Sequence, residues 1–186
     1  MAPSTARVLA AAAVAALALM SVVVPGAVAT PETACAAAAA RDRRVDYAFC
    51  VSRLSHHHDS PDADTWGLAK VAADVGVATA SDAVYDIKAL LVAGDAGKER
   101  EAALEQCRAL YEASGLAFAE AYDGINRRDY AAGKREAADA AGLARRCGGE
   151  AFARAGVPPP PQVARWGEEA EKIAVVCAAI TDLIIK

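Results

Sequence analysis

Apolar side chains recur at alternating spacings of three and four along two stretches of the chain. One set consists of Leu104, Cys107, Tyr111, Ser114, Phe118, Ala121 and Ile125, and the other of Val163, Trp166, Ala170, Ile173, Cys177, Ile180 and Ile184. This spacing places each set on one face of an α-helix, as in helices that pack into a bundle. The pattern predicts helices over about residues 98–126 and 162–185.

A third helix is predicted in the segment that ends near residue 94. Its apolar positions are Leu68, Val71, Val75, Val84, Ile87 and Leu91. Ser60-Pro61 has the sequence of an N-cap followed by proline at the first helical position, and Gly94 begins a glycine-containing exit loop. These signals predict a long helix over about residues 61–93.

A fourth helix is predicted from Asp129, a residue type that caps helix N-termini, to Cys147. Gly148 and Gly149 follow it and are expected to end it. The connections on either side of the helix over 98–126 are short, which favours antiparallel neighbours. No stretch alternates apolar and polar residues as a strand does. The sequence therefore predicts an all-α fold, an antiparallel up-down four-helix bundle.

The first 29 residues have the order of a secretory signal peptide. Arg7 is their only charged residue, a long Ala/Val/Leu stretch follows it, and Ala-Val-Ala at residues 27–29 fits a signal peptidase site. A membrane anchor is the alternative, but a Pro-Gly pair interrupts the apolar stretch before the cleavage site. We therefore predict a signal peptide over 1–29, an N-terminal segment over 30–58 and a bundle domain over 59–186.

Composition and charge narrow the classes of function. The formal net charge is −4 for the whole chain, and removal of Arg7 with the signal peptide changes it to −5. There is no basic tract and no interleaving of Lys or Arg with aromatic residues, which argues against nucleic-acid binding. Alanine is common and aromatic residues make up only 5% of the chain. The predicted core is therefore built from small side chains, each of which buries little apolar area.

No catalytic constellation is found. The histidines, His56, His57 and His58, are consecutive and precede Asp59, and there is no Gly-x-Ser-x-Gly motif or phosphate-binding glycine loop. Three consecutive histidines do not share one face of a helix, and nothing nearby in the sequence completes a zinc site. We therefore predict no metal and no cofactor, and interpret this segment as a loop whose charge, and with it partner binding, changes between about pH 5 and 7.

Five cysteines follow the predicted signal peptide, and a secreted chain permits disulfides. Cys107 and Cys147 are equidistant from the predicted turn between their helices, so on antiparallel helices they lie level, as an inter-helix bridge requires. Cys35 and Cys50 would be about 22 Å apart on one straight helix, so the chain must double back if they pair. Cys177 falls on the inner face of the last helix. This position indicates a buried free thiol rather than an exposed one that forms an intermolecular disulfide or senses redox state.

Taken together, these features resemble the plant invertase and pectin methylesterase inhibitor family. The most specific stretch is residues 103–111, Ala-Leu-Glu-Gln-Cys-Arg-Ala-Leu-Tyr, which is similar to the family's A-L-x-x-C-x-x-x-Y signature. Tyr130, the alanine-rich third bundle helix, Cys147 and the closing segment over 178–184 fit the same family pattern. The resemblance covers essentially the whole chain after the signal peptide.

The resemblance implies a helical hairpin over residues 30–58 ahead of the bundle. It also implies disulfides that join Cys35 to Cys50 and Cys107 to Cys147, with Cys177 unpaired. Members of the family are secreted inhibitors and not enzymes; each binds a carbohydrate enzyme of the plant cell wall and covers its active-site cleft. We therefore expect secretion to the apoplast and one of two partners, pectin methylesterase or acid invertase.

One loop favours pectin methylesterase as the partner. Invertase inhibitors of the family often carry a Pro-Lys-Phe element that enters the invertase cleft. The chain has no such element, and the corresponding loop over 156–161 reads Gly-Val-Pro-Pro-Pro-Pro. We predict inhibition of pectin methylesterase, with acid invertase as the alternative.

The predicted docking surface is the outer face of the second and third bundle helices. Its candidate residues are Arg108, Glu112, Glu120, Asp123, Lys134, Arg135, Glu136 and Asp139. Because a preformed surface loses little entropy on binding, a rigid helical hairpin suits this role. Charged residues on a bundle surface are also expected simply for solvation, and the same fold could serve as a storage-like protein without a target or as a ligand carrier. Small core residues argue against a large ligand cavity.

Overall fold

The computed structural model describes residues 29–94 and 97–185, and within these ranges it contains helices and turns but no strand. The helices are α1 (Pro31–Arg41), α2 (Tyr47–Ser55), η1 (Ser60–Asp62), α3 (Thr65–Ala93), α4 (Lys98–Asn126), α5 (Tyr130–Arg146), η2 (Cys147–Phe152), α6 (Ala153–Ala155) and α7 (Pro161–Ile184). The predicted all-α fold is confirmed.

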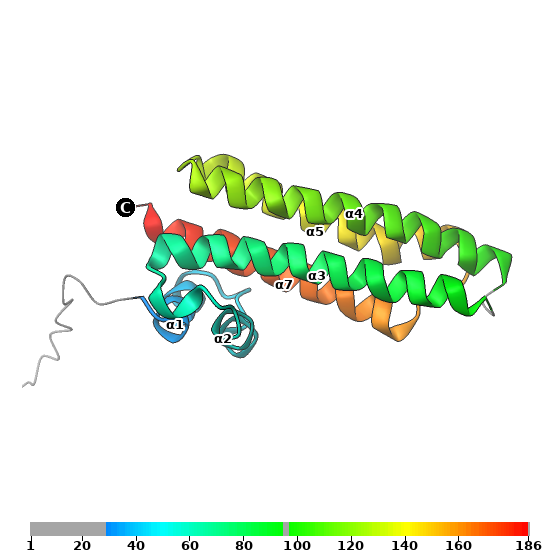
Figure 1. Ribbon diagram of the computed structural model, residues 1–186, viewed down its shortest axis with the longest axis horizontal. Helices are drawn as coiled ribbons and strands as arrows, with labels where there is room; N and C mark the ends of the chain where they lie inside the picture. Colours follow the sequence, from blue (N-terminus) through cyan, green and yellow to red (C-terminus); the bar gives the residue numbers. More distant parts are fainter. Residues whose placement is uncertain (1–28, 95–96, 186) are drawn as a thin grey trace, which may run out of the picture.

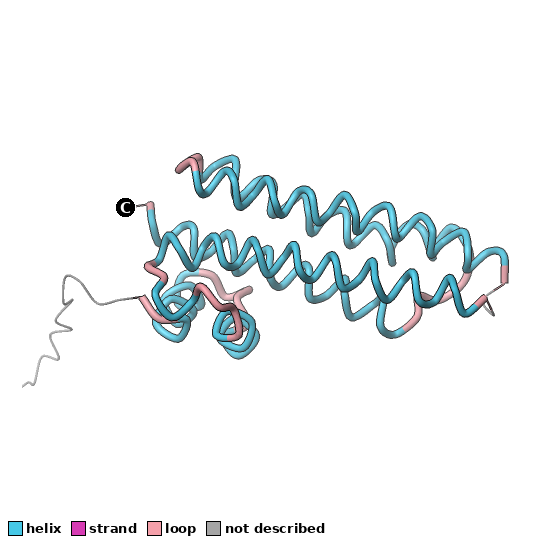
Figure 2. The backbone as a smooth tube through the Cα atoms, in the orientation of Figure 1, coloured by secondary structure: helices cyan, strands magenta, loops and turns pink. Residues whose placement is uncertain are grey.

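The four long helices α3, α4, α5 and α7 form an antiparallel bundle (Figure 1). In this bundle α4 packs between α3 and α5, and α7 closes the arrangement against α3 and α5. The turn between α4 and α5 lies at one end of the bundle, and the connection from α5 through η2 and α6 to α7 lies at the other end (Figure 2). The up-down topology predicted from the short connections is therefore confirmed.

Alanine and a few large side chains fill the core. Fully buried large residues include Tyr111, Phe118, Phe152, Ile125 and Ile173, and alanines occupy many of the remaining buried positions. Small side chains let the helices approach closely, and a close approach increases the number of dispersion contacts that each residue makes. The core thus depends on close fit more than on a large apolar area per side chain.

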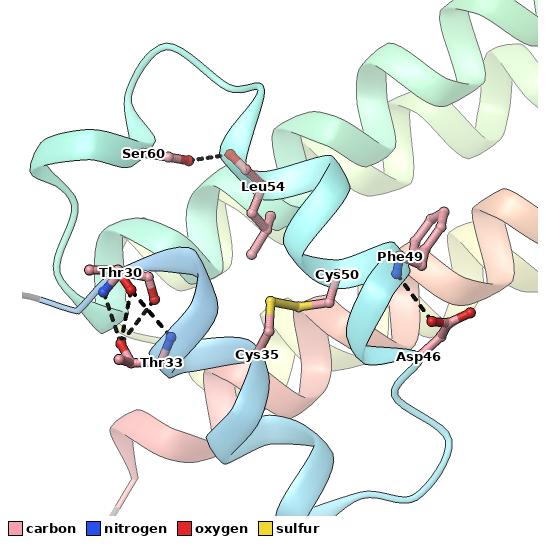
Figure 3. Close-up of a disulfide and its surroundings, with 8 residues drawn as sticks. All are labelled: Thr30, Thr33, Cys35, Asp46, Phe49, Cys50, Leu54 and Ser60. Carbon is pink, nitrogen blue, oxygen red and sulfur yellow. Dashed lines mark hydrogen bonds between the residues drawn. A yellow bond between two sulfur atoms is a disulfide. The ribbon is translucent and has the colours of Figure 1, made fainter.

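The N-terminal hairpin consists of α1 and α2, which are linked by a disulfide between Cys35 and Cys50 (Figure 3). Thr30 and Thr33 form a reciprocal capping box at the start of α1, and Asp46 caps α2 by accepting a 3.1 Å hydrogen bond from the Phe49 amide. These caps satisfy amide groups that a helix start leaves unpaired. The hairpin packs on α7 and α3 at one end of the bundle (Figure 1).

The start of α3 differs from the prediction. Ser60-Pro61 begins the short 3₁₀ turn η1 instead, and the Ser60 hydroxyl donates a 2.6 Å hydrogen bond to the Leu54 carbonyl (Figure 3). Asp64 is the N-cap of α3, because its carboxylate accepts a 2.7 Å hydrogen bond from the Gly67 amide. The predicted N-cap of α3 was therefore wrong by four residues, because the Ser60 side chain binds a carbonyl at the end of α2 and does not cap α3.

The predicted end of α5 was also wrong. Gly148 and Gly149 do not stop the helix; the chain continues through the π-helical turn η2 and the short α6 as far as Gly156, which adopts a left-handed conformation. Phe152 on this continuation is fully buried. Burial of an aromatic ring outweighs the weak helix propensity of two glycines, which is about 1 kcal/mol for each.

The signal peptide prediction lies outside the described residues, apart from Ala29 at its end. The predicted boundary between residues 58 and 59 falls in the turn between α2 and η1. Among the described helices, none is at once long enough and apolar enough to cross a bilayer.

Candidate docking surface

The hairpin of α4 and α5 is tightly joined at its turn. Asp129 caps α5 by accepting a 3.0 Å hydrogen bond from the Ala132 amide, and Arg128 takes a left-handed conformation with φ 64°. Beside the turn, a Cβ atom on Gly124 would lie 2.8 Å from the backbone nitrogen of Gly133. Only glycine fits where the two backbones come this close.

Two further links hold the hairpin away from its turn. In the middle, the buried Ser114 hydroxyl donates a 2.9 Å hydrogen bond to the Ala140 carbonyl. At the far end, a disulfide joins Cys107 to Cys147, whose Cα atoms are 4.7 Å apart. The two cysteines therefore lie level on neighbouring helices. Because the hairpin is held at its turn, its middle and its open end, its outer face is pre-ordered.

The four candidate residues on α4 all lie outside the core. The Arg108 guanidinium donates 2.9 Å hydrogen bonds to Glu105 and to Glu112. Both carboxylates favour the charged guanidinium and raise the pKa of Arg108. Glu120 and Asp123 are exposed one to two turns before the end of the helix. This face of α4 therefore presents an internally paired cluster at one end and, towards the turn, the exposed carboxylates of Glu120 and Asp123, of which Asp123 has a long 3.9 Å contact to Arg127.

The four candidate residues on α5 divide between two sides of that helix. Lys134 forms an ion pair with Asp182 of α7. Arg135 and Glu136 pair with each other at 3.4 Å. Asp139 is exposed and lines a shallow hollow of about 700 Å³ along the second half of α5 and the start of η2.

The eight candidate residues therefore do not form one continuous patch. Glu112 borders the groove between α3 and α4, whereas Lys134 faces α7 on the opposite side of the hairpin. Glu120, Asp123, Arg135 and Asp139 are exposed on the hairpin itself. These four are the candidates most directly available to a partner.

A groove between α3 and α4 was not predicted from the sequence. It has a volume of about 490 Å³ and is lined by residues that include Val77, Val84, Gly115 and Leu116. Leu116 is 69% exposed, and Tyr85 on α3 is 75% exposed. Both residues lie outside the apolar stripe that faces the core. A large apolar residue at such a position could have indicated this surface from the sequence alone. Large exposed apolar side chains of this kind mark candidate interaction surfaces.

Cys177 is a buried free thiol on α7. Its sulfur lies 3.8 Å from the Ala69 carbonyl oxygen, and burial raises the pKa of the thiol to about 12, against a smaller opposing effect of the Thr181 hydroxyl. A buried thiol of this kind is unreactive, because the thiolate is the nucleophile. The position fits the interpretation of Cys177 as a core residue.

The sequence profile of the family described as plant invertase/pectin methylesterase inhibitor matches residues 29–180. The chain therefore belongs to this family of enzyme inhibitors, and the resemblance drawn from the cysteine spacing and the residue 103–111 signature is confirmed.

Two rice (Oryza sativa subsp. japonica) proteins are similar in sequence. Pectinesterase inhibitor 8 is 70% identical over 156 residues, which span 84% of this chain and 84% of the relative. Pectinesterase inhibitor 12 is 42% identical over 165 residues, which span 89% of this chain and 79% of the relative. Each similarity covers more than four fifths of this chain.

Two solved structures from Arabidopsis share the fold. A mutant form of a pectin methylesterase inhibitor superposes with a TM-score of 0.64 at 17% identity, over 83% of this chain and 97% of its own. The crystal structure of a pectin methylesterase inhibitor from Arabidopsis thaliana gives 0.59 at 16% identity, over 81% and 97%. At this identity the likeness concerns the fold alone, a helical bundle with an N-terminal hairpin.

Proposed function

We propose that this chain inhibits pectin methylesterase by binding the enzyme and covering its active-site cleft. The observation that carries the proposal is the 70% identity over 156 residues with a rice protein named pectinesterase inhibitor 8. At this level of identity a shared target is the simplest expectation. Fold alone would not assign the target, because one scaffold can serve several functions.

The architecture of the α4–α5 hairpin supports binding by occlusion. Its turn, its central hydrogen bond and the Cys107–Cys147 disulfide hold the outer face in one arrangement before any partner arrives. A surface that is already ordered loses little conformational entropy on association. Two helices of 29 and 17 residues offer room for an interface of about 800 Å² on each partner.

Within this proposal, the docking surface is the exposed face that carries Glu120, Asp123, Arg135 and Asp139. The apolar rim of the α3–α4 groove, with Leu116 at its edge, adjoins it. Protein interfaces usually combine apolar and charged areas, as this surface does. Arg108, Glu112, Lys134 and Glu136 are engaged with neighbouring side chains and would contribute at the margin.

The site of action would be the apoplast. The predicted signal peptide and the two disulfides fit an oxidising, extracellular compartment. Acid invertase is the alternative target. The loop over 158–161 consists of four prolines and lacks the Pro-Lys-Phe element, which argues against invertase.

The experiment is a pair of inhibition titrations with the purified, oxidised protein at about pH 6, the acidic range of the plant wall. A plant pectin methylesterase should lose activity in proportion to added inhibitor and reach full loss near a one-to-one ratio, while a plant acid invertase keeps its activity. Loss of invertase activity alone would assign the alternative target. If neither enzyme is affected, the proposed function is wrong, and a bundle without an enzyme target becomes the better description.

A further inference from the structure

The turn between α2 and η1 brings two histidine rings and a carboxylate together. His56 to Asp59 lie in irregular backbone and not in a helix. The imidazole rings of His57 and His58 stack with their centroids 4.6 Å apart, and His58 Nε2 lies 3.3 Å from Asp59 Oδ1. Consecutive side chains of a helix would point in different directions, but a turn allows them to converge. The ligand-bearing atoms of His57, His58 and Asp59 all lie within 4.8 Å of one another.

His57 is held in place by a residue that the sequence does not place near it. Its Nε2 lies 2.8 Å from a carboxylate oxygen of Asp74, which belongs to α3. The His57 side chain is only 12% exposed. On its other side, the Asp59 backbone amide donates a 3.2 Å hydrogen bond to His57 Nδ1. Nδ1 therefore carries a lone pair, and the proton sits on Nε2, where it is donated to Asp74.

This arrangement is the one that protein metal sites use to orient a histidine ligand. In such sites a carboxylate accepts the hydrogen bond from one ring nitrogen, fixes the tautomer and leaves the other nitrogen free for the metal. Here Asp74 holds Nε2, and Nδ1 faces the side of the turn that carries Asp59. The 3.2 Å hydrogen bond from the Asp59 amide to Nδ1 is at the long end of the usual range, and a metal ion bound to Nδ1 would replace it.

The surroundings of the cluster attract cations. His57 and Asp59 line a cleft of about 500 Å³ beside the start of α3. Its other charged lining residues are Asp62, Asp64, Asp74 and Lys70. Four carboxylates against one ammonium group give the cleft a negative potential, which raises the local concentration of positive ions.

We propose that His57, His58 and Asp59 bind a divalent ion of the zinc class, with Asp74 as the positioning residue for His57. Two imidazoles and one carboxylate are ligands that Zn²⁺ accepts, and water completes the tetrahedral set. His58 and Asp59 have side chains that are 83% and 67% exposed, so both can shift to meet the ion at bonding distance. The prediction of no metal site rested on two arguments: three consecutive histidines do not share one helix face, and no further ligand lies nearby in the sequence. Asp74 is 17 residues from His57 in the sequence and was therefore not considered. The proposal does not depend on the identity of the inhibited enzyme.

The test is a Zn²⁺ titration by calorimetry at near-neutral pH of the untagged, oxidised protein that begins after the predicted signal peptide. We expect one ion per chain, and in the Co²⁺-loaded protein the visible absorption of a four-coordinate site. His58→Ala and Asp59→Ala should each weaken Zn²⁺ binding by about tenfold or more. Both residues are exposed at the surface, so these variants keep their helical circular dichroism, which is measured alongside.

His56 provides the matched control, because it is an exposed histidine of the same turn whose Nδ1 contacts the Ser52 carbonyl and which does not belong to the ligand cluster. His56→Ala should bind Zn²⁺ as the unmodified chain does. If His56→Ala weakens binding as much as His58→Ala, the turn is a generic polyhistidine tract and the proposed site is wrong. Absence of a single stoichiometric Zn²⁺ site would overturn it as well.

Asp74→Asn tests the positioning role. It should weaken Zn²⁺ binding by about tenfold while the stoichiometry stays at one ion per chain, because the ligands remain but His57 is no longer fixed. A purely structural role of Asp74 would instead lower the melting temperature of the metal-free protein and leave Zn²⁺ affinity unchanged. That second result would remove Asp74 from the site.

Discussion

Phe118 of α4 lies directly against Gly76 of α3, so close that a Cβ atom on Gly76 would be 2.4 Å from Phe118 Cδ1. The ring of Phe118 is fully buried, and close-packed protein interiors leave little room for a ring to shift. We predict that Gly76→Ala lowers the free energy of unfolding by about 2 kcal/mol, because overpacking outweighs the gain in helix propensity. Urea denaturation followed by circular dichroism measures this change.

Gly115 on α4 is the matched control for that substitution. A Cβ atom there would meet only Ala80 Cβ, at an ordinary 3.5 Å. Gly115→Ala should therefore leave stability unchanged or raise it by up to about 1 kcal/mol through helix propensity. Equal destabilisation by the two substitutions would contradict the assignment of Gly76 to a close helix contact.

The two disulfides are expected to contribute differently to stability. The bridge between Cys107 and Cys147 spans 40 residues of sequence, and the bridge between Cys35 and Cys50 spans 15. In the chain-entropy model, removal of the Cys107–Cys147 bridge lowers the free energy of unfolding by about 4 kcal/mol, and removal of the Cys35–Cys50 bridge lowers it by about 3 kcal/mol. Paired Cys→Ala variants and urea midpoints measure both values. A smaller loss for the 107–147 pair than for the 35–50 pair would show that native-state effects dominate over loop length.

Cys177 should resist thiol reagents in the folded protein. Burial raises the pKa of its thiol to about 12, so at about pH 8 almost no thiolate forms in the native state. The unfolded chain has an ordinary thiol, so added urea should release one equivalent of chromophore from a disulfide reagent. The pKa of the Cys177 thiol is higher in the folded protein than in the unfolded chain, so this pKa difference stabilises the folded state fully below the pKa of the unfolded chain. The stabilisation is lost as the pH rises from that value towards 12. Rapid labelling without urea would mean that Cys177 is accessible.

Charge reversal on the turn-proximal part of α4 should weaken inhibition. Glu120 and Asp123 are both exposed, and Asp123 has only a long 3.9 Å contact to Arg127. We predict that the double variant Glu120→Lys and Asp123→Lys raises the half-inhibitory concentration against pectin methylesterase by about tenfold or more, because charges placed against a complementary surface become repulsive. The melting temperature should stay within a few degrees of that of the original chain.

A charge reversal on another helix distinguishes an effect on the docking surface from an effect of the overall net charge. Glu168 is exposed on α7, a helix that is not part of the α4–α5 hairpin. Glu168→Lys should leave the half-inhibitory concentration unchanged. If it weakens inhibition as much as the double variant on α4, the effect comes from overall electrostatics, and the docking surface lies elsewhere.

The helices that could be predicted from sequence are those whose local signals agree with their tertiary environment. The helix over 98–126 was placed to the residue, because a sustained apolar stripe runs from Leu104 to Ile125 and a glycine precedes it. The end of α5 was misplaced, because burial of Phe152 outweighed two glycines. Local propensity is small beside the free energy of burying an aromatic ring.

The surface features were harder to predict because they depend on residues far apart in the sequence. His57 meets Asp74 across 17 residues, and the ion pair of Lys134 with Asp182 spans 48. The outward direction of the eight candidate docking residues followed from helical periodicity. Their division between two sides of the hairpin did not, because it depends on which neighbour lies beside each helix.

The α4–α5 hairpin is a covalently closed loop, with the chain at one end and the Cys107–Cys147 bridge at the other. Its turn contains Arg127 and Arg128, both exposed, and such a turn is a natural target for trypsin-like proteases. Cleavage there would not separate the helices, because the disulfide still joins the two fragments. An inhibitor cleaved at this exposed turn would thus remain a single molecule.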